Sequence, residues 1–147
     1  SRGLGDVYKR QVDDVKNSGC NKLAVADCYE DVIEMILTGV LYRGEISTLM
    51  PKEKERDFGG IEVIRPFYLV HKQDLKEWNM EFGMVTGTKE DFSDQQEEVK
   101  RLLEEFENIN PGIAANIFKS VENVNLNTVI AYHTGMGLHS FLEDYEQ

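Results

Sequence analysis

An apolar run followed at once by an amphipathic stretch constrains the fold of this chain more than any other feature. The run, Lys22–Asp27 (KLAVAD), has the length and the Val and Ala content of a buried strand. In the stretch Cys28–Gly39, four apolar side chains recur at helical spacing: Val32, Ile33, Ile36 and Leu37. Acidic residues fill its first turn and Gly39 follows its last, which predicts a helix that ends at this glycine. The sequence therefore opens on a strand, a loop and a helix, the first half of a βαβ unit.

Further segments favour strands. Residues of high strand propensity fill Ile61–Lys72, but Pro66 interrupts this segment and must lie at an edge, a bulge or a crossover. Weaker strand signals occur at Gly44–Pro51, Glu81–Gly87 and Gly112–Phe118. The charged segment PKEKERDFGG, which precedes the long strand, predicts a surface loop.

The clearest helix lies at Ser93–Asn108. Ser93 and Gln96 form a capping-box pattern at its start. One apolar stripe runs along it, made of Val99, Leu102, Leu103 and Phe106. A short helix or a turn is expected over Val12–Gly19. Short helices are expected over Leu126–Thr134, with Gly135 as its cap, and within Gly135–Asp144. Because strands and helices alternate, we predict an α/β domain with a mixed, mostly parallel sheet flanked by helices.

The first eleven residues, SRGLGDVYKRQ, show no helical or strand period and no apolar face. They resemble a library adaptor translated in frame. We therefore expect a non-native leader at residues 1–11, with a natural tail as the alternative. Residues 12–147 have the length of a single α/β domain and fit either a complete small protein or a fragment of a longer one.

The formal net charge of −11 bears on the possible partners. A surface this acidic repels phosphate groups, so we predict no direct nucleic-acid contact and no binding to membranes. The longest uncharged stretch, residues 123–142, is too polar to span a bilayer, and the first residues of the sequence show no apolar stretch as long as that of a signal peptide. Cys20 and Cys28 match no zinc or redox spacing. We therefore expect a cytoplasmic protein with no metal site and no cofactor.

Cys28 is the first candidate for chemistry, because it follows the predicted buried strand and precedes a helix. Ligands of α/β proteins bind beyond the carboxyl ends of strands. A helix N-terminus favours a thiolate, whereas the carboxylates of Asp27, Glu30 and Asp31 raise a thiol pKa. The same acidic loop suits a cation, an amino group of a ligand, or simply a helix start. A small semi-buried cysteine is the alternative, and His71, at the end of the long strand, is the second candidate.

The segment Tyr132–Ser140 (YHTGMGLHS) is the third candidate. Gly135 and Gly137 would let the backbone approach a ligand closely, and a following helix would offer N–H groups to an anion. His133 and His139 flank the loop, but six positions apart is not the spacing of a helical metal pair. A helix cap and a turn without a ligand is the alternative.

Three segments resemble the effector-binding domain of LysR-type regulators, a relative of the type 2 periplasmic binding proteins. They are KLAVADCYEDVIEMILTGVLYRGEISTLMP, IEVIRPFYLVHKQD and SVENVNLNTVIAYHTGMGL. Tyr42 and Arg43 depart from that family at an expected acidic position. The resemblance implies two lobes that clamp a small metabolite, such as a carboxylate or an amino acid. The implied ligand-binding residues are Cys28, Tyr29, Ser47, Thr48, Ser120, Gly135, Met136 and Gly137.

Three functions remain open. The main hypothesis is a small-metabolite-binding domain, the sensor part of a regulator. The alternative is a small α/β enzyme or enzyme subunit that uses Cys28 and a histidine, with His71, His133 and His139 as candidates. This alternative requires a thiol or an imidazole to converge with an acid in one pocket. The second alternative is an oligomerising accessory domain, a homo-oligomer marked by a large exposed apolar patch.

Overall fold

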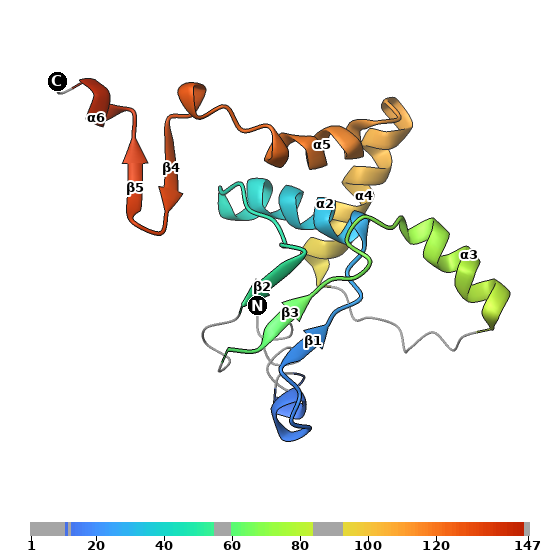
Figure 1. Ribbon diagram of the computed structural model, residues 1–147. Helices are drawn as coiled ribbons and strands as arrows, with labels where there is room; N and C mark the ends of the chain where they lie inside the picture. The colour runs from blue at the N-terminus through green and yellow to red at the C-terminus, as the bar shows by residue number, and fades with distance from the viewer. Residues whose placement is uncertain (1–10, 12, 55–59, 84–92, 146–147) are drawn as a thin grey trace.

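The computed structural model describes residues 11, 13–54, 60–83 and 93–145, so residues 1–10 of the expected leader lie outside it. Its architecture is mixed α/β, as the alternation of elements predicts. Figure 1 shows a small sheet on one side of a layer of helices, with a separate hairpin near the C-terminus. Within the described part of the chain, no helix is both long and apolar enough to cross a membrane.

The sheet has three short strands in the order β1-β3-β2. They are β1 (Lys22–Ala24), β2 (Lys52–Lys54) and β3 (Glu62–Ile64). β1 runs parallel to β3, whereas β2 runs antiparallel to it, and Val63 of the central strand pairs with Leu23 on one side and Glu53 on the other. The predicted mixed sheet is therefore present, but the described strands do not confirm that it is mostly parallel.

Three helices pack together on this sheet. α2 (Tyr29–Thr38) contacts both α4 (Asp94–Ile109) and α5 (Ile113–Glu122), and in Figure 1 it lies between the sheet and α5. The helical layer buries an apolar cluster made of Val32, Ile33, Ile36 and Phe118, and Ile61, Val63 and Val99 are buried as well. Burial of each such side chain contributes about 1.5–3 kcal/mol. The predicted apolar face of α2 is therefore the face that holds the helical layer together.

Gly39 does not end the helix, contrary to the prediction. Its backbone stays in the right-handed helical region, and the chain continues through a π-helical turn, Gly39–Arg43. Gly44, at φ 65°, ends the helix instead. A Cβ on Gly39 would lie 2.8 Å from the carbonyl oxygen of Glu45. Glycine is required at this position because the backbone of a later loop comes close, not because the helix must stop.

The helix expected at Ser93–Asn108 is confirmed as α4. Gln96 donates its backbone N–H to Ser93 Oγ over 3.3 Å, and Ser93 donates its own N–H to Gln96 Oε1 over 2.9 Å. These two bonds are the reciprocal pair of a capping box. Val99 on the apolar stripe is fully buried.

One predicted strand is shorter than expected, and another is absent from the described part of the chain. The long segment Ile61–Lys72 is a strand only over β3, because Pro66 opens a turn instead of a crossover within the sheet. The helix α3 (Lys72–Phe82) begins directly after this turn. The segment Gly44–Pro51 forms no strand, and β2 lies in the charged segment expected to be a loop.

The last third of the chain also differs from the predictions. The apolar run after Gly112 forms α5 rather than a strand, since a short apolar run fits either structure. The helix expected over Leu126–Thr134 is a single 3-10 turn, Leu126–Thr128, followed by a hairpin. Its strands are β4 (Ala131–Thr134) and β5 (Gly137–Ser140), and the short helix α6 (Leu142–Tyr145) follows them. The strand expected over Glu81–Gly87 is also wrong at its start, where Glu81 and Phe82 end α3, and residues 84–87 lie outside the described residues.

α3 and the hairpin extend away from the helical layer (Figure 1). No residue of α3 is buried, and its Trp78 and Phe82 rings lie 5.2 Å apart with large exposed surfaces. The hairpin and its flanks expose apolar side chains as well, with Met136 at 92% exposure. Among the described residues, the buried core is therefore confined to the sheet, the residues that flank its strands and the three helices.

Candidate functional site

The loops that follow the two parallel strands meet at one edge of the sheet. β1 ends at Ala24 and β3 at Ile64, and these two residues are register partners. The loop after β1 leads through Asp27 and Cys28 into α2, and the loop after β3 leads to His71 at the start of α3. The carboxyl ends of parallel strands are where α/β sheets hold their ligands, so this edge is the natural place for a site.

A buried arginine ties this edge together. Arg65 is 6% exposed, and its Nε atom lies 2.7 Å from Asp27 Oδ2. Its Nη1 atom lies 2.6 Å from Glu53 Oε1 and donates to the carbonyl oxygen of Met50 over 2.7 Å. Burial alone would lower the pKa of Arg65, but the hydrogen bonds to Asp27 and Glu53 raise it above its ordinary value. The sequence analysis missed this cluster, because it placed Arg65 inside a long strand.

Cys28 lies at the N-cap of α2 and is 2% exposed. Its backbone N–H donates to Asp31 Oδ2 over 2.8 Å, and its thiol donates to Glu30 Oε2 over 3.4 Å. Burial, with the Asp31 carboxylate second, raises the pKa of the Cys28 thiol to about 12. The thiol is therefore protonated at neutral pH, so burial, together with the acidic neighbours, outweighs any effect of the helix N-terminus.

Glu30 connects Cys28 to the loop that precedes α3. Its Oε1 atom lies 2.9 Å from His71 Nδ1, and its Oε2 atom accepts the backbone N–H of Lys72 over 2.7 Å. Burial would raise the pKa of the Glu30 carboxyl, but the hydrogen bonds from His71 and Lys72 hold it below its ordinary value. The structure thus brings Cys28 and His71 together through one shared carboxylate.

His71 is the accessible member of this cluster, with 58% of its side chain exposed. The Tyr29 ring packs edge-on against the imidazole at 4.7 Å between centroids and also lies 4.8 Å from the Phe118 ring. A carboxylate on Nδ1 fixes the orientation of an imidazole and, when the ring is neutral, places the proton on that nitrogen. Nε2 is then the nitrogen left to exchange a proton with a bound molecule.

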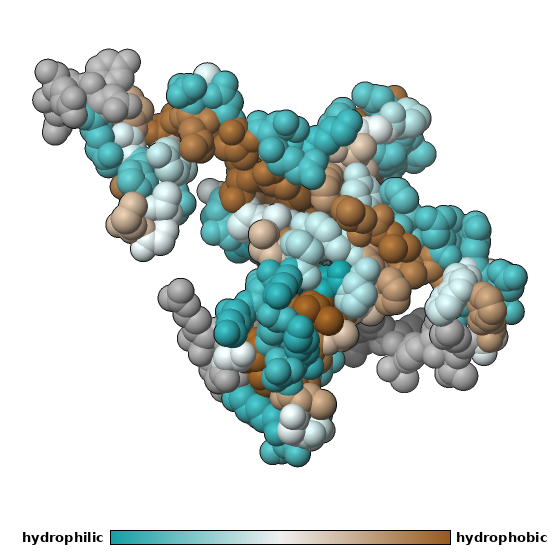
Figure 2. Space-filling view, in the orientation of Figure 1, coloured by the Kyte–Doolittle hydropathy of each residue, from teal (hydrophilic) through white to brown (hydrophobic). Residues whose placement is uncertain are grey.

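An apolar groove of about 520 Å³ adjoins this cluster. It lies between the loop before β2, the loop after β3 and the end of α5, and its walls include Thr48, Met50, Pro66, Tyr68, Phe118 and Glu122. Figure 2 shows apolar side chains gathered along α5 and on the loop between β3 and α3. The Tyr68 hydroxyl donates to the carbonyl oxygen of Leu49 over 2.8 Å, which fixes one aromatic wall.

The candidates near the C-terminus lie elsewhere. His133, Gly135, Met136 and Gly137 belong to the hairpin, which Figure 1 shows beyond the C-terminal end of α2, whereas Cys28 caps its N-terminus. His139 is also on the hairpin, so neither of these histidines converges with Cys28.

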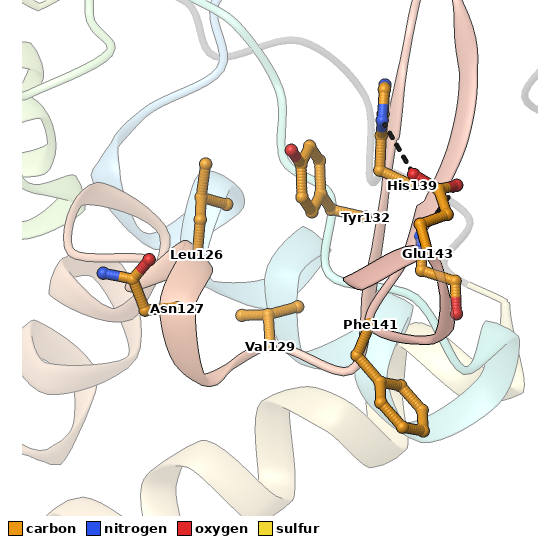
Figure 3. Close-up of a pocket in the computed structure, with 8 residues that line it drawn as sticks. Leu126, Asn127, Val129, Tyr132, His139, Phe141 and Glu143 are labelled. Carbon is orange, nitrogen blue, oxygen red and sulfur yellow. Dashed lines mark hydrogen bonds and ion pairs between the residues drawn. The ribbon is translucent and has the colours of Figure 1, made fainter. Parts of the chain in front are cut away.

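A smaller hollow of about 250 Å³ lies beside the hairpin (Figure 3). The rings of Tyr132 and His139 stack at 5.0 Å, and His139 Nδ1 lies 3.9 Å from Glu143 Oε2. The figure draws this pair as its dashed line and shows Phe141 pointing to the side opposite Tyr132. The exposed position of the hollow leaves its polar groups open to water.

The remaining residues implied by the LysR resemblance do not share one cleft. Ser47 Oγ donates to Glu45 within its own loop, and Ser120 Oγ donates to the carbonyl of Ile117 in its own helix. Only Thr48 among the serine and threonine candidates lines the apolar groove. Within the described ranges, no group of three histidine, cysteine, aspartate or glutamate side chains is placed to hold a metal ion.

Comparison with known proteins finds relatives that share one enzyme name. No family model matches the chain. Its relatives are named as sulfurtransferases that act on tRNA. The tRNA-cytidine(32) 2-sulfurtransferase 1 of Francisella philomiragia is 30% identical over 126 residues, which make up 82% of this chain and 46% of the relative. The tRNA-cytidine(32) 2-sulfurtransferase 2 of Francisella tularensis is 29% identical over 126 residues, or 82% of this chain and 47% of the relative. The chain thus spans about half the length of these relatives.

These relatives overturn three predictions. The resemblance to LysR-type regulators and periplasmic binding proteins is wrong, because its motifs are short patterns of apolar residues and glycines that many α/β sheets share. The sensor hypothesis falls with it, and the enzyme alternative fits the relatives better. The prediction of no nucleic-acid contact is also contradicted, since the relatives are named for a reaction on tRNA. Net charge is a sum over the whole surface of the protein, whereas RNA binds at one local region of that surface, which can carry a different charge.

Proposed function

We propose that this chain is part of a sulfurtransferase that modifies a cytidine in tRNA. The observation that carries this proposal is the similarity to the Francisella enzymes, which extends over 82% of the chain. The cluster at the carboxyl edge of the sheet supports the enzyme reading, because it brings a thiol, a carboxylate and an imidazole together.

In this proposal His71 moves protons at the site. The relatives' name describes transfer of sulfur to position 2 of a cytidine. If the sulfur arrives at the oxidation level of sulfide, its addition to C2 releases protons, and the oxygen that it replaces takes up protons and leaves as water. This exchange therefore needs a group that takes and gives protons. Glu30 holds His71 through Nδ1 and leaves Nε2 toward the accessible side. His71 is thus the candidate general acid and base, and Glu30 is its positioning residue.

Cys28 takes a different part in the same cluster. A nucleophilic cysteine reacts as the thiolate, and a thiol with a pKa of about 12 is almost entirely protonated at neutral pH. The thiol instead donates to the carboxylate that holds His71. We therefore assign Cys28 to the hydrogen-bond network that orients His71, and not to attack on the substrate.

The other expectations fit this proposal as follows. A tRNA substrate is consistent with a cytoplasmic protein, as the sequence predicts. Residues 12–147 would form a single domain, and β1 and β3 would belong to a larger, mostly parallel sheet in a protein as long as the relatives. Part of the contact with the tRNA phosphates would then come from outside the matched half, which reconciles an RNA substrate with a net charge of −11.

The test is the formation of 2-thiocytidine. The chain is expressed in a bacterium that lacks its own tRNA-cytidine 2-sulfurtransferase, both alone and in place of the matched segment of the Francisella philomiragia enzyme. Nucleosides from the digested tRNA are then measured by mass spectrometry. We expect 2-thiocytidine from at least the chimera, its loss in H71A and its retention in the matched variant H133A. A folded chimera that binds tRNA and forms equal 2-thiocytidine with and without His71 would contradict the assignment.

A further inference from the structure

We infer that the apolar groove between Thr48, Tyr68, Phe118 and Glu122 is a pocket for a single pyrimidine base, in which Glu122 selects cytosine over uracil and Thr48 binds the oxygen that both bases carry at position 2. This inference rests on the proposed function, since it places a base of the RNA substrate near the His71 cluster. It goes beyond the proposal because it assigns a location, one specificity-determining residue and one further binding residue to recognition of the base.

The walls of the groove suit a flat aromatic ligand. Tyr68 and Phe118 line it, with their ring centroids 6.0 Å apart and their planes inclined by 63°. The volume of about 520 Å³ lies within the range of pockets for small molecules. Proteins that read RNA by sequence take unstacked bases into such places, stack them on aromatic side chains and bond their edges. An apolar, aromatic groove that is open to solvent therefore suits a base taken out of an RNA loop.

One residue that lines the groove, Thr48, carries a buried polar atom without a partner in the described ranges. The Thr48 hydroxyl oxygen is buried and has no hydrogen-bond partner within the described part of the chain. A buried hydroxyl without a partner costs free energy, and such groups are uncommon in folded proteins. A ligand edge that accepts or donates a hydrogen bond would remove this cost. The Thr48 hydroxyl thus lacks a hydrogen-bond partner among the described residues of the free chain, and a polar edge on an aromatic ligand would supply one.

The second polar group of the groove carries charge. Glu122, at the last turn of α5, is an exposed carboxylate that lines the groove and only accepts hydrogen bonds when ionised. Carboxylates pair with the exocyclic N4 amino group of cytosine. Uracil has a carbonyl oxygen at the same position, and that oxygen would face the carboxylate without a proton between them. The groove thus favours cytosine through attraction and disfavours uracil through repulsion.

The groove is also next to the acid–base cluster. Phe118 forms part of its wall and packs against Tyr29, which in turn packs against the imidazole of His71. Val70 lines the groove and accepts the backbone N–H of Tyr29 over 3.0 Å. Two aromatic rings, those of Phe118 and Tyr29, therefore connect a base held in the groove to the group proposed to move protons.

The test uses two RNA stem–loops that differ only in one loop nucleotide, cytidine or uridine. Their affinity for the whole chain is measured by fluorescence anisotropy at a fixed salt concentration. We expect cytidine to bind roughly fivefold or more tightly than uridine, the scale of one good contact to a base edge. In E122Q the side-chain amide also donates a hydrogen bond, so the preference for cytidine is expected to vanish. In the matched variant E104Q, an exposed glutamate on α4, it is expected to persist.

Thr48→Val tests the second contact without a change of shape. The valine removes the hydroxyl, and since cytosine and uracil both carry an oxygen at position 2, binding of both RNAs is expected to weaken about equally. The melting temperature of T48V should not fall, because the hydroxyl has no partner in the free chain. A drop in affinity with unchanged folding therefore supports a ligand contact at Thr48.

Three results would overturn the pocket. The first is equal affinity for the two RNAs, and the second is an unchanged preference for cytidine in E122Q. The third is a dimer, seen by sedimentation, that dissociates when Tyr68 is changed, because a second copy of the chain would then cover the groove. The 2-thiocytidine assay separates this failure from failure of the proposed function. If the chimera thiolates tRNA equally with and without Glu122, only the base pocket is wrong. If no variant binds RNA and none forms 2-thiocytidine, both proposals are wrong.

Discussion

The Nδ1 atom of His71 lies 2.9 Å from Oε1 of Glu30, although 41 positions separate the two residues in the chain. The contact joins the first turn of α2 to the residue that caps α3, and the second oxygen of Glu30 accepts the backbone N–H of Lys72. One carboxylate thus fixes both the imidazole and the start of the helix that follows it.

Replacement of Glu30 by glutamine should weaken the fold in a way that depends on pH. Folding lowers the pKa of Glu30 below its ordinary value of 4.5, so its stabilising effect is complete above that pH and disappears as the pH falls through the folded-state value. We expect E30Q to lower the free energy of unfolding by about 1 kcal/mol at pH 7, the scale of a solvent-screened hydrogen bond to a charged group. Urea titrations at pH 7 and pH 3 measure the difference, which should shrink at pH 3. An equal loss at both values would show that the charge is not involved.

Glu34 should have the opposite pH dependence. Burial raises the pKa of its carboxyl from 4.5 to about 7, and the ammonium of Lys100, 4.0 Å away, offsets this only in part. The folded chain then holds a proton that the unfolded chain releases, so stability falls as the pH rises from about 4.5 to about 7.

We therefore expect Glu34→Gln to be nearly neutral at pH 4 and to stabilise the chain by about 1–3 kcal/mol at pH 8. Thermal melts at the two pH values measure this effect. Glu104→Gln, on the exposed side of α4, is the control and should change neither melt. A destabilised E34Q at pH 8 would mean that the ion pair with Lys100 outweighs the cost of burial.

Cys28 should react with thiol reagents far more slowly than Cys20 in the folded chain. Cys28 is buried with a pKa of about 12, whereas Cys20 is exposed. We expect alkylation at pH 8 to modify Cys20 at least about a hundredfold faster, since burial and a small thiolate fraction both slow the reaction. Mass spectrometry of the two peptides over time gives both rates, and labelling in denaturant gives the reference. Comparable rates in the native chain would rule out the buried, hydrogen-bonded thiol.

Arg65 should be the most sensitive polar position in the fold. Arg65→Met leaves Asp27 and Glu53 without their buried partner, and the loss of one member of a buried pair costs about 3–5 kcal/mol. Arg65→Lys keeps the charge, but a single ammonium group cannot reach both carboxylates and the Met50 carbonyl as the guanidinium does. We therefore expect an intermediate loss in the free energy of unfolding. Urea unfolding of the two variants beside Arg43→Met, a matched change at an exposed ion pair, checks the order. R65M as stable as R43M would contradict the role of this cluster.

Local signals in the sequence predict α2 and α4 well. In both, the apolar spacing and the start signal lie within one helix, so no knowledge of the rest of the fold is needed. The segment after Ile61 shows the opposite case. Most of its residues favour strands, yet the chain turns at Pro66 and His71 caps a helix. Tertiary contacts of Arg65 and Tyr68 decide that path, and a propensity scale does not contain them.

The candidate site is similarly divided. Cys28 and His71 stand out from their places at strand ends, but the carboxylate that joins them is visible only once the two loops meet. The contacts of Arg65 and the walls of the groove join segments that are distant in the sequence. Thr48 and Glu122, which both line the groove, are 74 positions apart. The acidic composition misled the choice of partner, since a whole-chain charge says nothing about one groove.

The buried guanidinium of Arg65 has a consequence for how the chain assembles. Its partners come from the loop after β1, from the residues just before β2 and from β2 itself. Until all of these partners are in place, the positive charge of Arg65 is buried at the edge of an apolar core without a counter-charge. A partly formed sheet is therefore higher in free energy than both the unfolded and the folded chain. The buried Arg65 thus makes the folding of this edge cooperative. The loops that carry the proposed chemistry therefore become ordered together.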